Sequence, residues 1–293
     1  MSKKPLWTPP ESRFLAPGDG AFKIADAPTE PRKRTDKDVL KEALDGHVDE
    51  IRELQKKLFA ANRYAVLFVF QAMDAAGKDG TIRAVFTGVN PAGFQVFNFV
   101  APSNEELDHD FLWRIASRLP ERGRIGVFNR SHYEEVIIAR VHPHFLEKQR
   151  LPRIDEKRIW SERYESIRDV EKHLARNGTV VVKFFLNISL DQQKRRLLRR
   201  IDNPKRNWKF NPSDVAERAR WPDYMRAYED AINATSRAWA PWYVIPADDK
   251  PYMRVQVAKI IHQTLEGLGV EFPTVSDETL AALAECRATL EGQ

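Results

Sequence analysis

The stretch Tyr64–Ile82 reads YAVLFVFQAMDAAGKDGTI and decides the fold. Its first seven residues are all apolar, which is typical of a strand buried on both faces of a parallel sheet. A loop that contains Gly77 and Lys78 follows, and Gly80 and Thr81 begin a predicted helix. Where a strand leads through such a loop into a helix, backbone N–H groups and the helix dipole point at a bound anion. The stretch therefore predicts a phosphate-binding loop.

The loop departs at two positions from the usual phosphate-loop pattern, GxxxxGK followed by Ser or Thr. Ala72 stands where the first glycine belongs, and Asp79 stands where the hydroxyl that binds Mg²⁺ belongs. Asp74, inside the loop, is a candidate to supply a carboxylate to the metal instead. The alternative is an ordinary strand, turn and helix in which Lys78 is merely solvated.

Strands and helices alternate along the rest of the chain. Further strands are predicted over residues 94–100, 124–129, 179–188 and 242–246, and helices over residues 36–60, 104–119, 155–176, 190–201 and 250–268. This alternation predicts a parallel α/β sheet with helices on both faces. The expected division is an extended, proline-rich arm over residues 1–35, one α/β domain over residues 36–270, and a helical tail over residues 271–293.

The third predicted strand ends in polar residues. The stretch RIGVFNRSHYEEV places Asn129 at the carboxyl end of the strand, which is the edge where open α/β sheets bind ligands. Arg130 is a candidate to neutralise charge on a transferring phosphoryl group. Asn129 carries no negative charge for a metal, so Glu134 or Glu135 is the candidate to compensate. The alternative is that Asn129 caps a helix beginning near Ser131.

The histidines of the chain are not expected to carry the chemistry. Phosphoryl transfer depends mostly on positioning and on charge neutralisation, so His132 is interpreted as structural. His142 and His144 flank a proline and lack partners at metal-ligand spacing, so no zinc site is predicted.

A second signal is the basic segment KRRLLRRIDNPKRNWK, Lys194–Lys209, which holds eight positive residues and one negative residue. The whole chain carries a net charge of +5, so its basicity is local, and a polyanionic ligand is indicated. A basic helix broken at Pro204 is typical of a mobile lid over a phosphate site, here about residues 194–213. The alternatives are a solvated helix face and a surface that binds nucleic acid.

Composition excludes several other classes of protein. The chain has 293 residues with 42% hydrophobic and 10% aromatic residues, values that are ordinary for a globular protein. The longest apolar run, residues 64–70, is too short to span a bilayer, and the N-terminus lacks the apolar region of a signal peptide. The single cysteine, Cys286, permits no intrachain disulfide. We therefore expect a cytoplasmic protein without a membrane partner.

Four ordered motifs together resemble the family-2 polyphosphate kinases: MDAAGKDGTI, FNRSHYEEV, RRIDNPKRNWKF and WAPWYVIPADDK. The resemblance covers roughly residues 36–268. It implies a three-layer α/β/α P-loop kinase fold with a parallel sheet, related to thymidylate kinase, with a helical lid. It also implies that a phosphoryl group moves directly between inorganic polyphosphate and a nucleotide, with Mg²⁺ or Mn²⁺.

The resemblance also implies roles for individual residues. Asp74 would bind the metal and lie between the phosphate donor and the acceptor. Glu134 is the second candidate to bind the metal. Lys78 and Arg130 would hold the transferring phosphate, with Asn129 beside them. The phosphates of the chain or of the nucleotide would contact the remaining loop and basic residues, namely Ala75, Ala76, Gly77, Asp79, Gly80, Thr81, Arg83, Arg196, Arg200, Lys205 and Lys209.

The NRSHYEEV variant is similar to the subgroup that phosphorylates both AMP and ADP. Adenine nucleotides are the expected acceptors, with guanine nucleotides as a second candidate, and a homodimer or homotetramer is expected. Nucleic acid is not an expected partner. Two rival functions stay open: an ATP-dependent nucleotide kinase on the same fold, and a non-catalytic nucleic-acid-binding protein that uses residues 194–209.

Overall fold

Five parallel strands form one sheet at the centre of the molecule, in the order β2-β3-β1-β4-β5. The computed structural model describes residues 6–293, apart from the side chain of Lys209. The strands are β1 (Ala65–Ala72), β2 (Phe94–Asn98), β3 (Ile125–Asn129), β4 (Thr179–Asn187) and β5 (Trp242–Pro246). The five predicted strands and their parallel arrangement are therefore confirmed.

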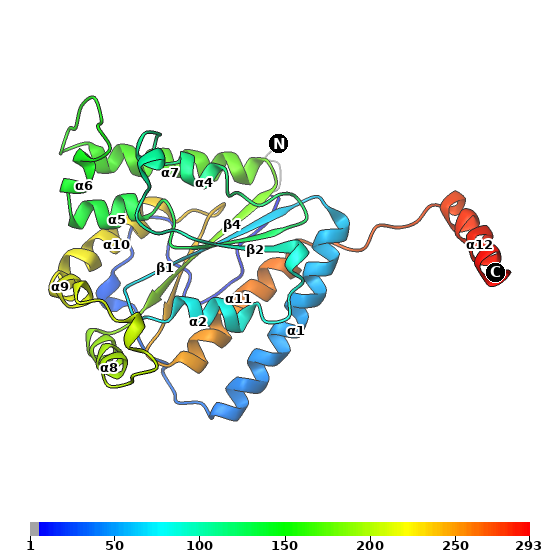
Figure 1. Cartoon of the computed structure of the whole chain (residues 1–293), viewed down its shortest axis with the longest axis horizontal. Helices are drawn as coiled ribbons and strands as arrows, with labels where there is room; N and C mark the ends of the chain where they lie inside the picture. Colours follow the sequence, from blue (N-terminus) through cyan, green and yellow to red (C-terminus); the bar gives the residue numbers. More distant parts are fainter. Residues whose placement is uncertain (1–5) are drawn as a thin grey trace.

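Helices cover both faces of this sheet, so the predicted three-layer α/β/α fold is confirmed (Figure 1). One layer contains α1 (Lys37–Ala61), α2 (Lys78–Val85) and α11 (Lys250–Glu266). The other layer contains α5 (Glu134–Val141), α7 (Ile159–Arg176) and α10 (Trp221–Thr235). Beyond the carboxyl ends of the strands lie α8 (Leu190–Ile201), the 3₁₀ turn η3 (Asn207–Lys209) and α9 (Ser213–Ala219).

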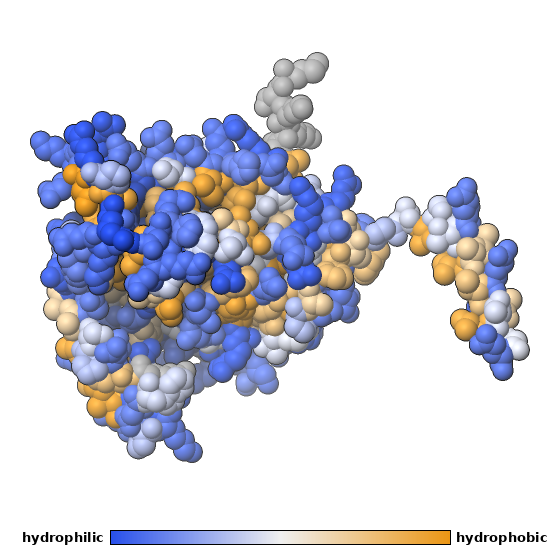
Figure 2. All heavy atoms as spheres, turned by 45° about the horizontal axis from the view of Figure 1, so that its top comes forward, coloured by the Kyte–Doolittle hydropathy of each residue, from blue (hydrophilic) through white to orange (hydrophobic). Residues whose placement is uncertain are grey.

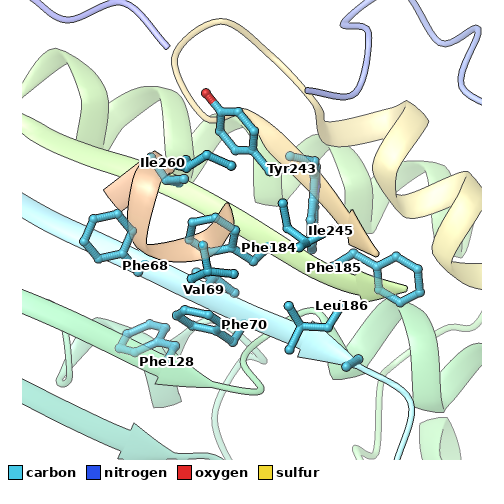
Figure 3. Packing of buried hydrophobic residues seen from close by; sticks show 14 of the residues in the cluster. Phe68, Val69, Phe70, Phe128, Phe184, Phe185, Leu186, Tyr243, Ile245 and Ile260 are labelled. Atoms are coloured by element: carbon cyan, nitrogen blue, oxygen red, sulfur yellow. The ribbon is translucent and has the colours of Figure 1, made fainter. Parts of the chain in front are cut away.

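The core is built on the central strands because every residue of β1 is buried. Phe70 of β1 stacks on Phe184 of β4 with ring centroids 4.9 Å apart, and Phe68 lies 6.2 Å from the same ring (Figure 3). A strand with both faces covered by helices needs apolar residues at every position, which is the pattern of residues 64–70. The polar end of β1 is therefore fixed at the edge of a rigid sheet.

One predicted helix is wrong. Residues 104–119 form two single turns, α3 (Asn104–Leu107) and α4 (Trp113–Ala116), and not one helix. The Asp110 carboxylate accepts from the backbone N–H of Leu112, and the Asp110 carbonyl accepts from Trp113. Such local bonds of an aspartate compete with helix continuation, so the chain turns at this point.

Several further elements were not predicted, among them α6 (His144–Glu147), the 3₁₀ turns η2 (Pro91–Gly93) and η3, α9 and α10. The sequence does carry a signal for α10, since Tyr224, Ala227, Tyr228 and Ala231 recur at helical spacing and are all buried.

The N-terminal segment lies along β5. The backbone N–H of Ala16 donates to the carbonyl of Trp242, and the N–H of Val244 donates to the carbonyl of Phe14. The described part of this segment contains one 3₁₀ turn, η1 (Ile24–Asp26). Residues 1–5 of the predicted arm lie outside the described residues, and the division into arm, domain and tail remains a prediction.

The C-terminal helix α12 (Asp277–Glu291) projects away from the rest of the molecule (Figure 1). Apolar side chains lie exposed along it, Leu280 and Leu283 among them (Figure 2). Over residues 6–293, no helix combines the length and the apolar character that crossing a membrane requires.

Candidate active site

The phosphate loop comprises residues 73–77, between β1 and α2. Gly77 is the N-cap of α2 and adopts a φ of 107°, a conformation that side chains disfavour, and no side chain caps the helix. The first N–H groups of α2 are therefore available to an anion. Lys78 is the first residue of α2, and its Nζ donates to the carbonyl of Ala72 at 3.1 Å. The predicted strand, loop and helix are present.

Asp74, Arg130 and Glu134 meet beside this loop. Arg130 follows β3, and its Nη2 donates to Asp74 Oδ1 at 2.8 Å, while its Nη1 lies 3.8 Å from Glu134 Oε2. Arg130 has a φ of 62°, which turns the chain from the strand toward α5. The structure thus brings together three candidates that are up to sixty residues apart in the sequence.

Burial and neighbouring charges perturb the titration of this group. Burial lowers the pKa of Lys78 and Arg130 lowers it further, while Asp74 opposes both. Burial would also lower the pKa of Arg130, but the Glu134 and Asp74 carboxylates raise it above its ordinary value. Burial raises the pKa of Glu134, against the effect of Arg130 and Lys78. Groups with perturbed pKa values in a cleft mark a functional site, and here a bound anion would favour the charged Lys78.

Asn129 belongs to a hydrogen-bond network at the same edge. Its Nδ2 donates to Asp79 Oδ1 at 2.8 Å and to Asn98 Oδ1 at 2.7 Å, whereas its Oδ1 is buried and has no hydrogen-bond partner among the described residues. The alternative prediction that Asn129 caps the following helix is wrong, because α5 begins at Glu134 and Tyr133 is its N-cap.

The site opens into a cleft of about 1420 Å³. This volume exceeds the usual range for a pocket that binds one small ligand, so the cleft has room for an extended ligand or for more than one. Among the side chains that the structure describes, two carboxylates, those of Asp74 and Asp79, face the cleft against ten basic side chains. The basic residues are Lys78, Arg83, Arg130, Arg196, Arg199, Arg200, Lys205, Arg206, Lys250 and Arg254.

Two of these basic residues, Lys250 and Arg254, were not predicted for the site, and Arg199 and Arg206 were predicted only as part of the basic segment. Lys250 and Arg254 lie four residues apart at the start of α11, so they share one face of that helix. The sequence shows this spacing, but not that α11 packs beside α2. Partial burial, together with the nearby Arg196 and Arg254 charges, lowers the pKa of Lys250 to about 8.

Five basic residues of the basic segment line one wall of this cleft, namely Arg196, Arg199, Arg200, Lys205 and Arg206. Arg200 Nη1 lies 3.3 Å from Asp214 Oδ2 at the start of α9, and Lys205 is exposed at the cleft. Arg196 is buried, and its guanidinium donates to backbone carbonyls, including that of Ala76 at 2.6 Å. The side chain of Lys209 lies outside the described residues. The segment is therefore placed where the sequence predicts a lid.

The donor set of the site suits a hard cation. Asp74 and Glu134 supply carboxylate oxygens, and Mg²⁺ in phosphoryl-transfer sites uses one or two carboxylates together with water and substrate phosphates. Among residues 6–293, no group of three or more His, Cys, Asp or Glu side chains forms a complete metal site. Substrate oxygens would therefore complete the coordination.

His132 is buried in the described structure, and neither ring nitrogen has a hydrogen-bond partner there. Burial and the Lys183 charge lower the pKa of His132 to about 3. Its side chain is thus a neutral core group and does not line the cleft.

A buried lysine on an uncapped helix N-terminus, in a basic cleft at the carboxyl edge of a parallel sheet, defines a phosphotransferase of the P-loop type. The family described as Polyphosphate kinase 2 (PPK2) matches residues 34–273. The chain therefore belongs to the polyphosphate kinase 2 family.

Similar proteins agree with this family. An "ADP-polyphosphate phosphotransferase" of Rhodopseudomonas palustris is 51% identical over 85% of this chain and 87% of its own length. An "AMP/ADP-polyphosphate phosphotransferase" of Meiothermus ruber is 47% identical over 76% of this chain and 80% of its own length. The crystal structure of a polyphosphate kinase 2 from Arthrobacter aurescens matches with a TM-score of 0.86 at 38% identity, over 94% of this chain and 95% of that one.

Proposed function

We propose that this protein transfers a phosphoryl group from inorganic polyphosphate to ADP and to AMP. The observation that supports it best is the cleft with ten basic side chains against two carboxylates. Polyphosphate carries about one negative charge per unit, so a groove of this charge suits it by the same counterion logic that applies to nucleic acid. AMP is included because one relative is named for AMP and ADP, while another is named for ADP.

In the proposed reaction, a phosphate oxygen of the nucleotide attacks the terminal phosphorus of the polyphosphate. The bridging P–O bond breaks, its electron pair stays on the bridging oxygen, and the shortened chain leaves. The nucleotide phosphate is already ionised, so no general base is needed. Lys78 and Arg130 neutralise the charge of the transferring group, and the loop N–H groups orient it.

Asp74 and Glu134 are the proposed metal ligands, and Mg²⁺ or Mn²⁺ supplies charge neutralisation at the phosphate oxygens when bound. Removing divalent cations with EDTA should abolish turnover, and either cation should restore it. Asp74→Asn and Glu134→Gln should raise the Mg²⁺ concentration needed for half-maximal activity by about 10-fold or more. An unchanged Mg²⁺ dependence in both variants would remove these residues from the metal site.

The proposal also covers acceptors, assembly and location. Adenine nucleotides are the proposed phosphate acceptors, and guanine nucleotides are a second candidate for the acceptor. A homodimer or homotetramer in the cytoplasm is the proposed form of the protein, which sedimentation velocity and cell fractionation would test.

The deciding experiment is a product assay with purified protein, Mg²⁺ and long-chain polyphosphate. AMP, ADP, GMP and GDP are supplied separately, and products are separated by chromatography. ADP followed by ATP should appear from AMP. ATP from ADP alone would remove the AMP activity. Turnover with ATP as the donor and none with polyphosphate would contradict the proposal and favour an ordinary nucleotide kinase.

A further inference from the structure

Arg196 of α8 has contacts that a simple phosphate ligand does not need. Its Nη1 donates to the carbonyls of Ala75 at 3.1 Å and Ala76 at 2.6 Å. Its Nη2 donates to the carbonyls of Ala247 at 2.6 Å and Asp248 at 2.9 Å. Each terminal guanidinium nitrogen carries two N–H bonds, so backbone carbonyls occupy all four of them. Only 6% of the residue is exposed.

Gln193, one turn earlier on α8, extends this contact. Its Nε2 donates to the carbonyl of Asp74 at 3.1 Å, and its Oε1 accepts from Arg218 of α9 at 3.0 Å. Gln193 is 1% exposed. The carbonyls of three consecutive loop residues, 74–76, are therefore all bonded to α8.

The same guanidinium joins two loops that the sheet keeps apart. The phosphate loop follows β1, and Ala247 follows β5, while β4 lies between those two strands. Arg196 therefore crosses the end of β4 and connects both loops to the first turns of the lid. This contact pattern differs from that of the exposed Arg195 and Arg199 on the same helix.

The direction of these bonds matters for anion binding. In a trans peptide the N–H of one residue points opposite to the carbonyl of the residue before it. Holding the carbonyls of Asp74 and Ala76 against α8 thus turns the N–H groups of Ala75 and Gly77 away from α8. Ala75 has a φ of 65°, a conformation that a non-glycine residue adopts only where its surroundings enforce it.

We propose that Arg196 and Gln193 are positioning residues that fix the backbone of the phosphate loop in its anion-binding conformation and link it to the lid. Arg196 acts through the loop and not as a ligand of polyphosphate. This inference deepens the proposed phosphoryl transfer and rests on it. A loop without these bonds would place Asp74 and the N–H groups less accurately against the transferring phosphate.

The first test is the kinetics of Arg196→Lys, which keeps the charge but loses the planar fork. The kcat for ATP formation should fall by up to about 10²-fold, with little change in KM for polyphosphate or ADP. Arg195→Lys, the exposed neighbour on the same helix, is the matched control and should behave as the unaltered protein. A raised KM for polyphosphate with an unchanged kcat would show that Arg196 is a phosphate ligand and would overturn the proposal.

The second test measures the loop itself, by amide hydrogen exchange of peptides covering residues 72–80 in the nucleotide-free protein. These peptides should exchange about fivefold faster in Arg196→Lys than in Arg195→Lys. Gln193→Leu removes the bond to the Asp74 carbonyl and the bond from Arg218, and leaves the four Arg196 bonds in place. It should give a smaller change in the same direction, and it provides the test if Arg196→Lys fails to fold. Unchanged exchange would contradict the proposal even if polyphosphate proved not to be the donor.

Discussion

Lys78 and Lys183 are both buried lysines, yet their surroundings differ completely. Lys183 lies in β4, and its Nζ donates to Tyr133 Oη at 3.0 Å, Glu171 Oε2 at 2.5 Å and the Thr235 carbonyl at 3.0 Å. Lys78 Nζ donates to one carbonyl, that of Ala72, and faces the basic cleft. One ammonium group has all three of its hydrogen bonds inside the protein, and the other does not.

This difference indicates that the charge of Lys183 stabilises the fold, whereas the charge of Lys78 is available to a ligand. Burial lowers the pKa of Lys183 to about 8, and Glu171 opposes the change as its ion-pair partner. Burial lowers the pKa of Lys78 and the neighbouring Arg130 lowers it further, so a bound anion would stabilise the charge of Lys78. A buried cation with unused donors beside other cations indicates an anion site.

The largest expected effect is the loss of stability on replacing Lys183, the lysine that stabilises the fold. Lys183→Met should lower the free energy of unfolding by about 3–5 kcal/mol, because it leaves the Glu171 carboxylate buried without its cation. Urea denaturation would measure this loss. The double variant Lys183→Met with Glu171→Leu should recover most of it, because no uncompensated charge remains. A single variant as stable as the unaltered protein would mean that Lys183 is not a structural charge.

Lys78→Ala should have the opposite profile. Turnover should fall by about 10²–10³-fold, because one preorganised donor to the transferring phosphate is lost. The free energy of unfolding should change little, since Lys78 has no internal ion-pair partner as close as Glu171 is to Lys183. Initial rates of ATP formation and urea denaturation of the same sample would separate the two effects. Retained turnover would remove Lys78 from the reaction.

The smallest effect concerns Lys250, whose side chain lines the cleft and is less buried than those of Lys78 and Lys183. Because its pKa is about 8, it loses its positive charge as the pH rises through that value. The KM for polyphosphate should therefore rise by roughly 2- to 5-fold above this pH. Lys250→Arg stays charged and should abolish this rise in a pH series of initial rates. The same rise in that variant would assign the titration to another group.

The sequence predicted the five strands and the phosphate loop because both depend on local patterns. A short apolar run such as residues 64–70 favours a buried strand, and a Gly-Lys pair between a strand and a helix favours phosphate binding. The wrong prediction of a single helix over residues 104–119 also has a local cause. The bonds of Asp110 to the backbone N–H of Leu112 and from Trp113 end the helix that the apolar spacing suggested.

Contacts across the sheet could not be predicted. Asn98 and Asn129 face each other because β2 and β3 are neighbours, and strand order is not encoded in any single strand. Arg196 and Arg200 share a helix, and nothing in their spacing distinguishes the one that bonds to carbonyls from the one that pairs with Asp214. Such partners are set by the fold as a whole.

The pairing of the N-terminal segment with β5 has a consequence for solubility. Phe14, Leu15 and Ala16 cover the outer edge of the last strand, and they precede the family match at residues 34–273. Without them, β5 would present unpaired N–H and carbonyl groups, which invite strands of other molecules to pair. A chain shortened to begin at residue 34 should therefore self-associate with rising concentration, which light scattering would detect. We therefore expect a short stretch that precedes the family match to protect the edge of the sheet from such pairing.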